Sequence, residues 1–205
     1  MSRRLKYAFR MTHITNVPHV LRCGLVRADS PLRDPGYVPI GDPQVIRLRE
    51  ERLVNGYKIS DYIPFYLGPR SPMLYVIQHG YNGVQRVEPE NIVYCIVRLD
   101  DLVNADIDCL FTDGHALSSI TKYYGKEELP QIDTIVKMED VYSSQWISET
   151  DIDLKRRKEA ELLVKNDLPA SLIRGFAVYN EAARQKIEAM GVAPEKIAVK
   201  PEYYF

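Results

Sequence analysis

The chain has 205 residues, enough for one domain with a real hydrophobic core, with or without a small lobe. Its formal net charge of −1 argues against a protein held on duplex DNA by bulk electrostatics, so any contact with nucleic acid must come from local basic patches. Tyrosine is unusually abundant, with 14 residues against 5 phenylalanines, and its ring suits ligand clefts and base stacking as well as half-buried surface positions.

The three cysteines are odd in number and scattered, which predicts a reducing, cytoplasmic compartment. His13, His19 and Cys23 lie close in sequence, but they lack a fourth ligand and a recognisable zinc spacing, so we expect no metal site. No apolar run approaches membrane-spanning length, and the start M-S-R-R-L-K-Y-A-F-R has no apolar core of the signal type. We therefore expect no membrane partner.

The N-terminal part predicts a strand over residues 5–12 that leads into H-I-T-N-V at 13–17. Residues 17–25 form an expected short helix that Gly24 ends. Residues 27–43, rich in Pro, Gly, Asp and Ser, predict a long loop, and loops of this length are usually functional or mobile.

Asp42 caps and Pro43 starts an expected helix over residues 43–53. We expect Ile46, Leu53 and Arg49 to share a face, from which an inward arginine could reach a cleft. Otherwise the segment is a surface helix. Its arginines form one of the two local basic patches of the chain, Arg47, Arg49 and Arg52.

The most informative stretch of the chain is D-Y-I-P-F-Y-L-G-P-R-S-P-M-L-Y at residues 61–75. Its first half alternates, with Ile63, Phe65 and Leu67 on one face, which predicts a strand. Pro64 cannot donate to a sheet, so we expect this strand at an edge or beside a bulge.

Ser71 and Pro72 read as the cap and first residue of a helix after the Gly68-Pro69 break. Arg70 sits beside that helix N-terminus, where a guanidinium and free N–H groups would bind phosphate or diphosphate. The alternative is a loop arginine paired to a nearby carboxylate.

The middle of the chain predicts a buried strand over residues 91–99 and a short strand over 109–112. The second strand ends in T-D-G-H-A, where an Asp113-Gly114 turn presents His115. Residues 126–140 read as a polar connection with a helix around 135–141.

Residues 151–167 combine the second basic patch, Lys155-Arg156-Arg157-Lys158, with an expected strand, A-E-L-L-V-K. Such a charge run is most often a solvated face. Glu161 lies inside the apolar run, so it either points to solvent from an edge or lines a cleft. The remaining chain predicts a helical turn and strand over 170–180, an amphipathic helix over 181–191 and a last strand over 196–201.

The motifs H-I-T-N-V, the arginine-rich helix, D-Y-I-P-F-Y-L-G-P-R-S-P-M-L-Y, T-D-G-H-A and K-R-R-K-E-A-E-L-L-V together resemble the DarT family from about His13 to the C-terminus. These bacterial toxins ADP-ribosylate bases in single-stranded DNA. The resemblance implies an α/β ADP-ribosyltransferase fold, with two small β-sheets and flanking helices around an NAD cleft. It also implies one such domain over residues 1–205.

The resemblance assigns roles to matching positions. It implies Glu161 as the catalytic glutamate, with Arg49 and His115 facing the DNA base. Because a guanidinium holds its proton tightly, an orienting role suits Arg49, whereas His115 has a better-matched pKa for proton transfer. The cofactor would lie against His13, Thr15, Arg70, Ser71 and Met73, and the DNA against Arg47, Arg49, Arg52 and His115. Many members carry Asn-Leu where this chain has His19-Val20, so a cofactor contact by side chain 19 is not implied.

The resemblance therefore implies NAD as co-substrate, no metal, single-stranded DNA as target and a cognate antitoxin that removes the ADP-ribose. Several segments look more like members that modify guanine than members that modify thymine. Two alternatives stay open, a transferase that modifies proteins and a non-catalytic module that binds NAD or nucleic acid.

Overall fold

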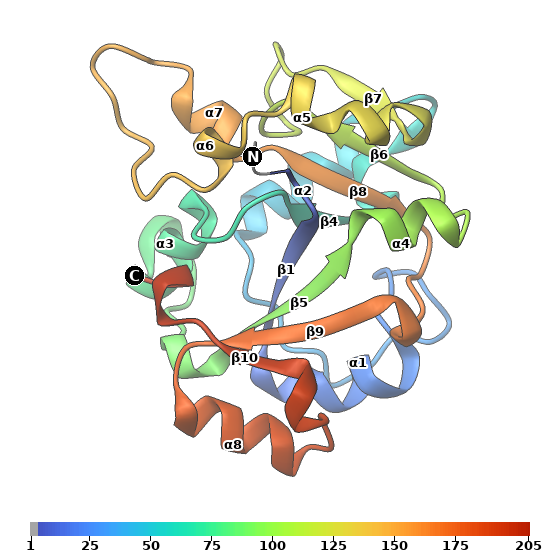
Figure 1. Ribbon diagram of the computed structural model, residues 1–205, viewed down its shortest axis with the longest axis vertical. Coiled ribbons are helices and arrows are strands. Elements are labelled where there is room, and N and C mark those ends of the chain that lie inside the picture. Colours follow the sequence, from blue (N-terminus) through green and yellow to red (C-terminus); the bar gives the residue numbers. More distant parts are fainter. Residues whose placement is uncertain (1–3) are drawn as a thin grey trace.

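The computed structural model describes residues 4–205 and contains the predicted strands and helices in the expected order (Figure 1). It adds strands at residues 53–54, 57–58 and 123–125 and a helix at 99–104 that the sequence did not predict. Residues 1–3 belong to the stretch in which we expect no signal sequence, and they lie outside the described part. The strands are β1 Tyr7–His13, β2 Leu53–Val54, β3 Tyr57–Lys58, β4 Tyr62–Tyr66, β5 Ile92–Arg98, β6 Cys109–Thr112, β7 Tyr123–Gly125, β8 Glu161–Lys165, β9 Ile173–Val178 and β10 Ile197–Val199. The α-helices are α1 Val17–Cys23, α2 Pro43–Glu51, α3 Pro72–His79, α4 Leu99–Asn104, α5 Ile132–Ile135, α6 Met138–Val141, α7 Leu154–Lys158 and α8 Glu181–Ala189.

The main sheet has the order β10-β9-β5-β1-β4-β8-β6-β7, and β2 and β3 form a separate hairpin. Within residues 4–205, the ladder between β1 and β4 consists of one pair, Phe9 opposite Tyr66. The flanking ladders are long, since β1 pairs with β5 over seven residues and β4 with β8 over five. The sheet is therefore two four-stranded halves joined at a seam, with β5 and β9 lower and β8 and β6 higher in Figure 1. The predicted fold class is confirmed.

The prediction that β4 lies at an edge or beside a bulge is wrong, because β4 lies inside the sheet and its described register with β8 runs unbroken through Pro64. β4 is flanked by β1 and β8, but β1 has already separated from it at this position. The Pro64 carbonyl accepts a hydrogen bond of 3.1 Å from Arg10 Nη1 instead of a backbone N–H. A strand can carry proline where its neighbour has moved away, because the missing N–H has no partner to lose.

The predicted alternation along β4 and β8 is confirmed. Ile63, Phe65 and Leu67 pack with Leu162 and Val164 in the larger core cluster. The opposite face of β8 carries Glu161 and Leu163, and Leu163 belongs to a smaller cluster with the β2–β3 hairpin. A third cluster joins Phe9 of β1 to α3 and the C-terminal segment. The sheet therefore has covered faces on both sides of β8, and Glu161 is 1% exposed.

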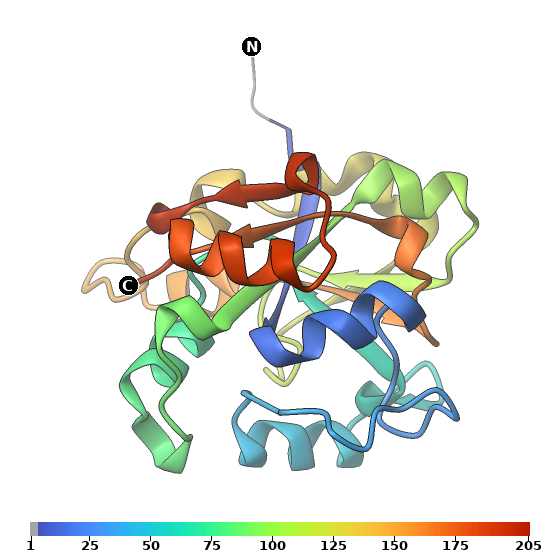
Figure 2. The same cartoon turned by 90° about the horizontal axis from the view of Figure 1, so that it is seen from below.

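The two helices that flank the seam begin as the sequence predicts. The Asp42 carboxylate accepts the Gln44 N–H at the start of α2, and Ser71 Oγ accepts the Leu74 N–H at the start of α3. Both helices lie toward the lower edge of Figure 2, at the same end of the molecule. The expected inward face of α2 is only partly right, because Arg49 is buried while Ile46 and Leu53 are exposed.

The bend before α3 needs a glycine for steric reasons. A Cβ on Gly68 would lie 2.1 Å from the carbonyl oxygen of Val141, so α6 packs directly on this backbone.

The helix predicted around 135–141 is in fact two short helices, α5 and α6, separated by Val136 and Lys137. Over residues 4–205, no helix combines the length and apolar character that a bilayer crossing requires.

Candidate active site

A cavity of about 550 Å³ opens at the seam between the two half-sheets. Phe9, Arg10 and Met11 line it from β1, and the whole of β4 except Phe65 lines it from the other side. Arg49 reaches it from α2, Met73 from α3 and Glu161 from β8. The separation of β1 from β4 therefore places an arginine and a carboxylate from distant parts of the chain in one cleft.

Glu161 is held by both of its carboxylate oxygens. Oε2 accepts a hydrogen bond of 2.6 Å from Arg49 Nη2, and Oε1 accepts one of 2.9 Å from the Ala116 N–H. Its own backbone N–H donates to Thr112 Oγ1 at 2.9 Å. A buried carboxylate with two charge-assisted or backbone donors has a fixed orientation. Of the two readings of Glu161, the structure supports the one in which it lines a cleft.

Arg49 is a buried cation, with its side chain 11% exposed. Burial alone would lower the pKa of its guanidinium, but the Glu161 carboxylate outweighs that effect and the pKa is raised. Its Nη1 is buried and has no hydrogen-bond partner among residues 4–205. Arg49 therefore keeps its proton and offers a free donor inside the cavity wall.

His115 follows the predicted Asp113-Gly114 turn and is anchored by its N–H, which donates to the Arg156 carbonyl at 2.9 Å. Burial lowers the pKa of its imidazole, and Arg49 and Lys155 lower it further, while Glu161 acts in the opposite direction. The ring is therefore neutral near pH 7 and able to accept a proton. The charges of Arg49 and Glu161 therefore act on His115, although His115 is not among the residues that line the cavity.

A second carboxyl, Glu159, lies two residues before Glu161 and is 8% exposed. Burial raises its pKa to about 7, and the nearby Glu161 contributes to the rise, while Lys155, Arg49 and Lys158 oppose it. Burial also raises the pKa of Tyr66 in β4, next to these two carboxylates. Glu161 lines the cavity, whereas Glu159 does not, so the second carboxyl with a raised pKa is buried beside the site rather than in its lining.

His13 and Thr15 form a local unit at the end of β1. His13 Nδ1 accepts the Thr15 N–H and lies 2.7 Å from Thr15 Oγ1, an arrangement that leaves its Nε2 as the donor nitrogen. Burial lowers the pKa of His13. His13 lies two residues beyond the cavity-lining Met11 on the same strand face, and Asn16 beyond it also lines the cavity. His19 lines the cavity too, with its Nε2 2.8 Å from the Leu32 carbonyl oxygen.

The three predicted site residues at the bend before α3 have different surroundings. Met73 lines the cavity. Ser71 caps α3, and its hydroxyl opposes the rise in the pKa of Tyr66 that burial causes. The Arg70 backbone has a positive φ of 58°, its N–H donates to Tyr94 Oη, and its guanidinium lies 4.5 Å from the centre of the Phe205 ring. Within residues 4–205 it makes no ion pair with a carboxylate, and its buried Nε has no partner.

The two basic patches have different structures. Arg47 is exposed on α2, and Arg52 is half-buried at the end of that helix. The run at 155–158 is not a solvated face. Arg156 and Arg157 pair with aspartates, and the buried Lys158 donates to the Val141 carbonyl at 3.2 Å. Burial and the nearby Arg70 lower the pKa of Lys158 to about 8.

Several residues of the site have no sequence signal that would single them out. The Ala116 N–H and Thr112 Oγ1 act on Glu161 across more than forty residues of chain. Tyr123 Oη donates to the Ala116 carbonyl from the β7 strand. The predicted T-D-G-H-A motif contains Thr112 and Ala116, but it draws attention to the histidine rather than to its neighbours.

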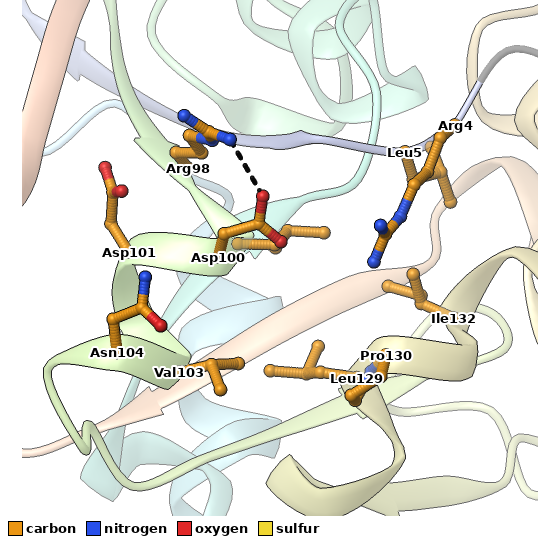
Figure 3. A pocket seen from close by; sticks show the side chains of 11 residues that line it. Arg4, Leu5, Arg98, Asp100, Asp101, Val103, Asn104, Leu129, Pro130 and Ile132 are labelled. Atoms are coloured by element: carbon orange, nitrogen blue, oxygen red, sulfur yellow. Dashed lines mark hydrogen bonds and ion pairs between the residues drawn. The ribbon is translucent and has the colours of Figure 1, made fainter.

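A second cavity of about 410 Å³ lies near the other end of β1, around Arg4, Arg98 and α4 (Figure 3). Its arginines are already engaged, Arg98 by Asp100 at 2.9 Å and Arg4 by Asp133 at 3.4 Å. The Arg98–Asp100 pair is 40% and 48% exposed, whereas the Arg49–Glu161 pair is buried. In residues 4–205 no cluster of three or more His, Cys, Asp or Glu side chains has metal-binding geometry. The cavity at the seam is therefore the candidate active site.

The chain is similar to one family of known proteins over nearly its whole length. The family model described as "ssDNA thymidine ADP-ribosyltransferase, DarT" matches residues 9–205. A DNA ADP-ribosyl transferase of Escherichia coli O127:H6 is 32% identical over 185 residues, which cover 88% of this chain and 83% of the relative. A DNA ADP-ribosyl transferase–DNA ADP-ribosyl glycohydrolase fusion protein of Thermosipho africanus is 27% identical over 98% of this chain and 50% of its own length.

Solved structures of the Thermus sp. 2.9 DarT have the same fold. The structure in complex with ADP-ribosylated single-stranded DNA superimposes with a TM-score of 0.82 at 28% identity, and the match covers 100% of both chains. The structure in complex with NAD+ superimposes with a TM-score of 0.77 at 26% identity, again over 100% of both chains.

Proposed function

The chain belongs to the DarT family of DNA ADP-ribosyltransferases, and from this premise we propose that it transfers ADP-ribose from NAD to a nucleobase in single-stranded DNA and releases nicotinamide. The observation that carries the proposal is the buried Glu161, fixed by Arg49 and Ala116 in the cavity at the seam. NAD as co-substrate and single-stranded DNA as target are supported by the matching NAD+ and DNA complexes of the Thermus protein. The proposed unit is one domain over residues 1–205.

Glu161 has the central role in the proposed reaction. Breaking the bond between nicotinamide and its ribose develops positive charge on that ribose. A fixed carboxylate at the anomeric centre stabilises this charge and accepts a hydrogen bond from the ribose 2′-hydroxyl. Each carboxylate oxygen has two acceptor sites, so Glu161 can receive the hydroxyl while it keeps its Arg49 and Ala116 bonds.

Arg49 and His115 act on the DNA base. A nitrogen of the base attacks the anomeric carbon as the nicotinamide bond breaks, and the base loses a proton. Arg49 is a poor proton acceptor because it holds its proton beside Glu161, but its free Nη1 can orient the base. His115 is neutral at pH 7 and takes the proton.

The remaining proposed contacts divide between cofactor and DNA. His13 and Thr15 hold the nicotinamide ribose and amide, while Arg70, Ser71 and Met73 lie against the rest of NAD. Met73 is supported by its place in the cavity wall. Arg47 and Arg52, on and after α2, contact the DNA backbone beside Arg49 and His115. A single strand suits this site because its bases are not locked in a duplex and can reach a recessed carboxylate.

Guanine is the first base to test and thymine the second. Segments of the chain such as T-D-G-H-A look like family members that modify guanine, whereas the family description names thymidine. A toxin role implies an antitoxin that removes the ADP-ribose, and the fusion relative from Thermosipho supports such a partner, since one chain joins the transferase to a glycohydrolase. A DNA target also fits the cytoplasmic location that the scattered cysteines predict.

The test is incubation of the protein with NAD and a randomised single-stranded oligonucleotide pool, followed by mass analysis of the nucleosides. We expect one ADP-ribosylated nucleoside, release of nicotinamide, and loss of both in a folded Glu161→Ala variant. Labelled polypeptide with unlabelled DNA would indicate a protein-modifying transferase instead. Binding of NAD or DNA without nicotinamide release would indicate a non-catalytic module.

A further inference from the structure

Glu161 is attached to one short segment of the chain, residues 112–116, through both its side chain and its backbone. Its Oε1 accepts the Ala116 N–H at 2.9 Å, and its backbone N–H donates to Thr112 Oγ1 at 2.9 Å. Thr112 Oγ1 in turn donates to the Gly114 carbonyl at 2.6 Å. The orientation of the Glu161 carboxylate therefore depends on where segment 112–116 lies.

Both the side chain and the backbone of Arg156, in α7, form hydrogen bonds with segment 112–116. Arg156 Nη1 donates to Asp113 Oδ1 at 2.9 Å, and the Arg156 carbonyl accepts the His115 N–H at 2.9 Å. A Cβ on Gly114 would lie 2.4 Å from Arg156 Nη1 and 2.9 Å from its carbonyl oxygen. Only glycine allows the segment to approach Arg156 this closely.

Arg156 is itself fixed by a two-point contact. Its Nε and Nη2 donate to the two carboxylate oxygens of Asp153 at 2.7 and 2.8 Å. The side chain is 15% exposed, so the contact is largely shielded from water. A planar guanidinium that donates to carboxylates on two sides has a fixed position, because its donors have a fixed fork geometry.

We propose that Arg156 is a positioning residue for the transfer reaction, which sets the orientation of Glu161 through segment 112–116. The inference rests on the proposed catalytic role of Glu161. Arg156 does not line the cavity, so its effect on the reaction passes through Ala116 and Thr112 rather than through substrate. The basic run that resembles a nucleic-acid patch therefore contributes a support for the catalytic carboxylate.

Arg157 is a matched control on the same helix. It pairs with Asp140 at 2.7 Å and with Asp151 at 2.6 Å, and its side chain is 26% exposed. Its hydrogen bonds within residues 4–205 go to these residues and Asp153, not to segment 112–116. Arg157→Ala removes a comparable set of ion pairs. Arg157 shares only Asp153 with Arg156, and the two shorter bonds from Arg156 to Asp153 stay in place.

The first measurement uses hydrogen exchange of the Ala116 amide in the free protein, compared with an amide of β8. We expect Arg156→Ala to speed exchange at Ala116 by about tenfold or more relative to β8, because the segment opens locally. In Arg157→Ala, exchange at Ala116 and in β8 should change together. Unchanged relative exchange at Ala116 in Arg156→Ala would overturn the proposal, whether or not the protein modifies DNA.

The second measurement is the kinetics of nicotinamide release. We expect Arg156→Ala to lower kcat by about 10²-fold with little change in KM for NAD, since a displacement of about 1 Å of a catalytic group has that effect. Arg157→Ala should stay close to the parent. A lower affinity for NAD with kcat intact, or equal losses in both variants, would count against positioning.

If Arg156→Ala does not fold, Asp113→Asn tests the same support by weakening the ion pair between Arg156 and Asp113 without creating a cavity. It should show the same local exchange at Ala116 and a smaller loss of kcat. A parent protein that releases no nicotinamide would remove the proposed enzymatic function, yet the Ala116 exchange would still decide the structural coupling.

Discussion

Arg49 Nη2 lies 2.6 Å from Glu161 Oε2, and the two side chains are 11% and 1% exposed. The pair joins the outer helix α2 to the inner strand β8 across the cavity. It neutralises two charges that neither element could bury alone. The predictions below begin from this pair and move outward.

Breaking the pair on one side should destabilise the protein more than removing it altogether. Arg49→Gln and Glu161→Gln each leave one buried charge uncompensated, which costs about 3 kcal/mol in comparable pairs. The double variant removes both charges, so its loss should be clearly smaller than the sum of the two. Urea unfolding of all four proteins measures the coupling. Additive losses would show that the two charges do not interact.

His115 should give the DNA-transfer step a characteristic pH profile. Because burial lowers the pKa of its imidazole, the ring becomes protonated at a lower pH than an ordinary histidine, whose pKa is about 6.5. The decline of the transfer rate on the acid side should therefore have its midpoint below about pH 6.5.

Replacement of His115 tests its role directly. His115→Asn should slow transfer to DNA by about 10²-fold and abolish the acid limb. Hydrolysis of NAD in the absence of DNA should be much less affected, because that reaction removes no proton from a nucleobase. An acid limb that persists in His115→Asn would assign it to another group.

Glu159 should make stability fall as the pH rises. Its pKa is about 7 in the folded protein against an ordinary value of 4.5, so the folded state binds the proton more tightly between these two pH values. The stability that protonated Glu159 contributes is complete below about pH 4.5 and is lost as the pH rises through about 7.

Glu159→Gln should therefore stabilise the protein by on the order of 2 kcal/mol at about pH 8 and have little effect at about pH 4.5. Thermal melting at both pH values measures the difference. A gain in stability that is equal at the two values would mean that Glu159 titrates normally.

Gly68 should tolerate no side chain. Its Cβ would lie 2.1 Å from the carbonyl oxygen and 2.6 Å from the carbonyl carbon of Val141, which are backbone atoms of α6. Gly68→Ala should cost about 1–3 kcal/mol, as overpacking in a core does. Gly41→Ala is the control, because its Cβ would meet only Ile46 Cδ1 at an ordinary 3.7 Å. Equal melting temperatures for the two variants would contradict the clash.

Local signals were enough to predict most of the elements that build the site. Ser71 and Pro72 mark the start of α3, and Asp42 and Pro43 mark the start of α2, because caps act within four residues. The alternation around Phe65 and Leu162 identifies the buried faces of β4 and β8 for the same reason. These patterns depend on neighbouring residues alone.

The features that sequence reasoning missed depend on distant partners. Pro64 is acceptable inside the sheet because β1 diverges there, and nothing in β4 reports this divergence. Arg156 and Arg157 look like a solvated charge run until Asp113 and Asp140 are brought next to them. Arg49 is the inward residue of α2 because Glu161, 112 positions later, provides its counter-charge.

The contact between Phe9 and Tyr66 has a mechanical consequence. Within residues 4–205, β1 and β4 are joined by one backbone pair and by the bond from the Arg10 side chain to the Pro64 carbonyl, while the larger core cluster packs residues of both half-sheets together. The cavity therefore opens where few hydrogen bonds connect the two half-sheets. A dinucleotide that contacts both half-sheets would add interactions across this seam, so NAD binding should make the enzyme measurably more rigid.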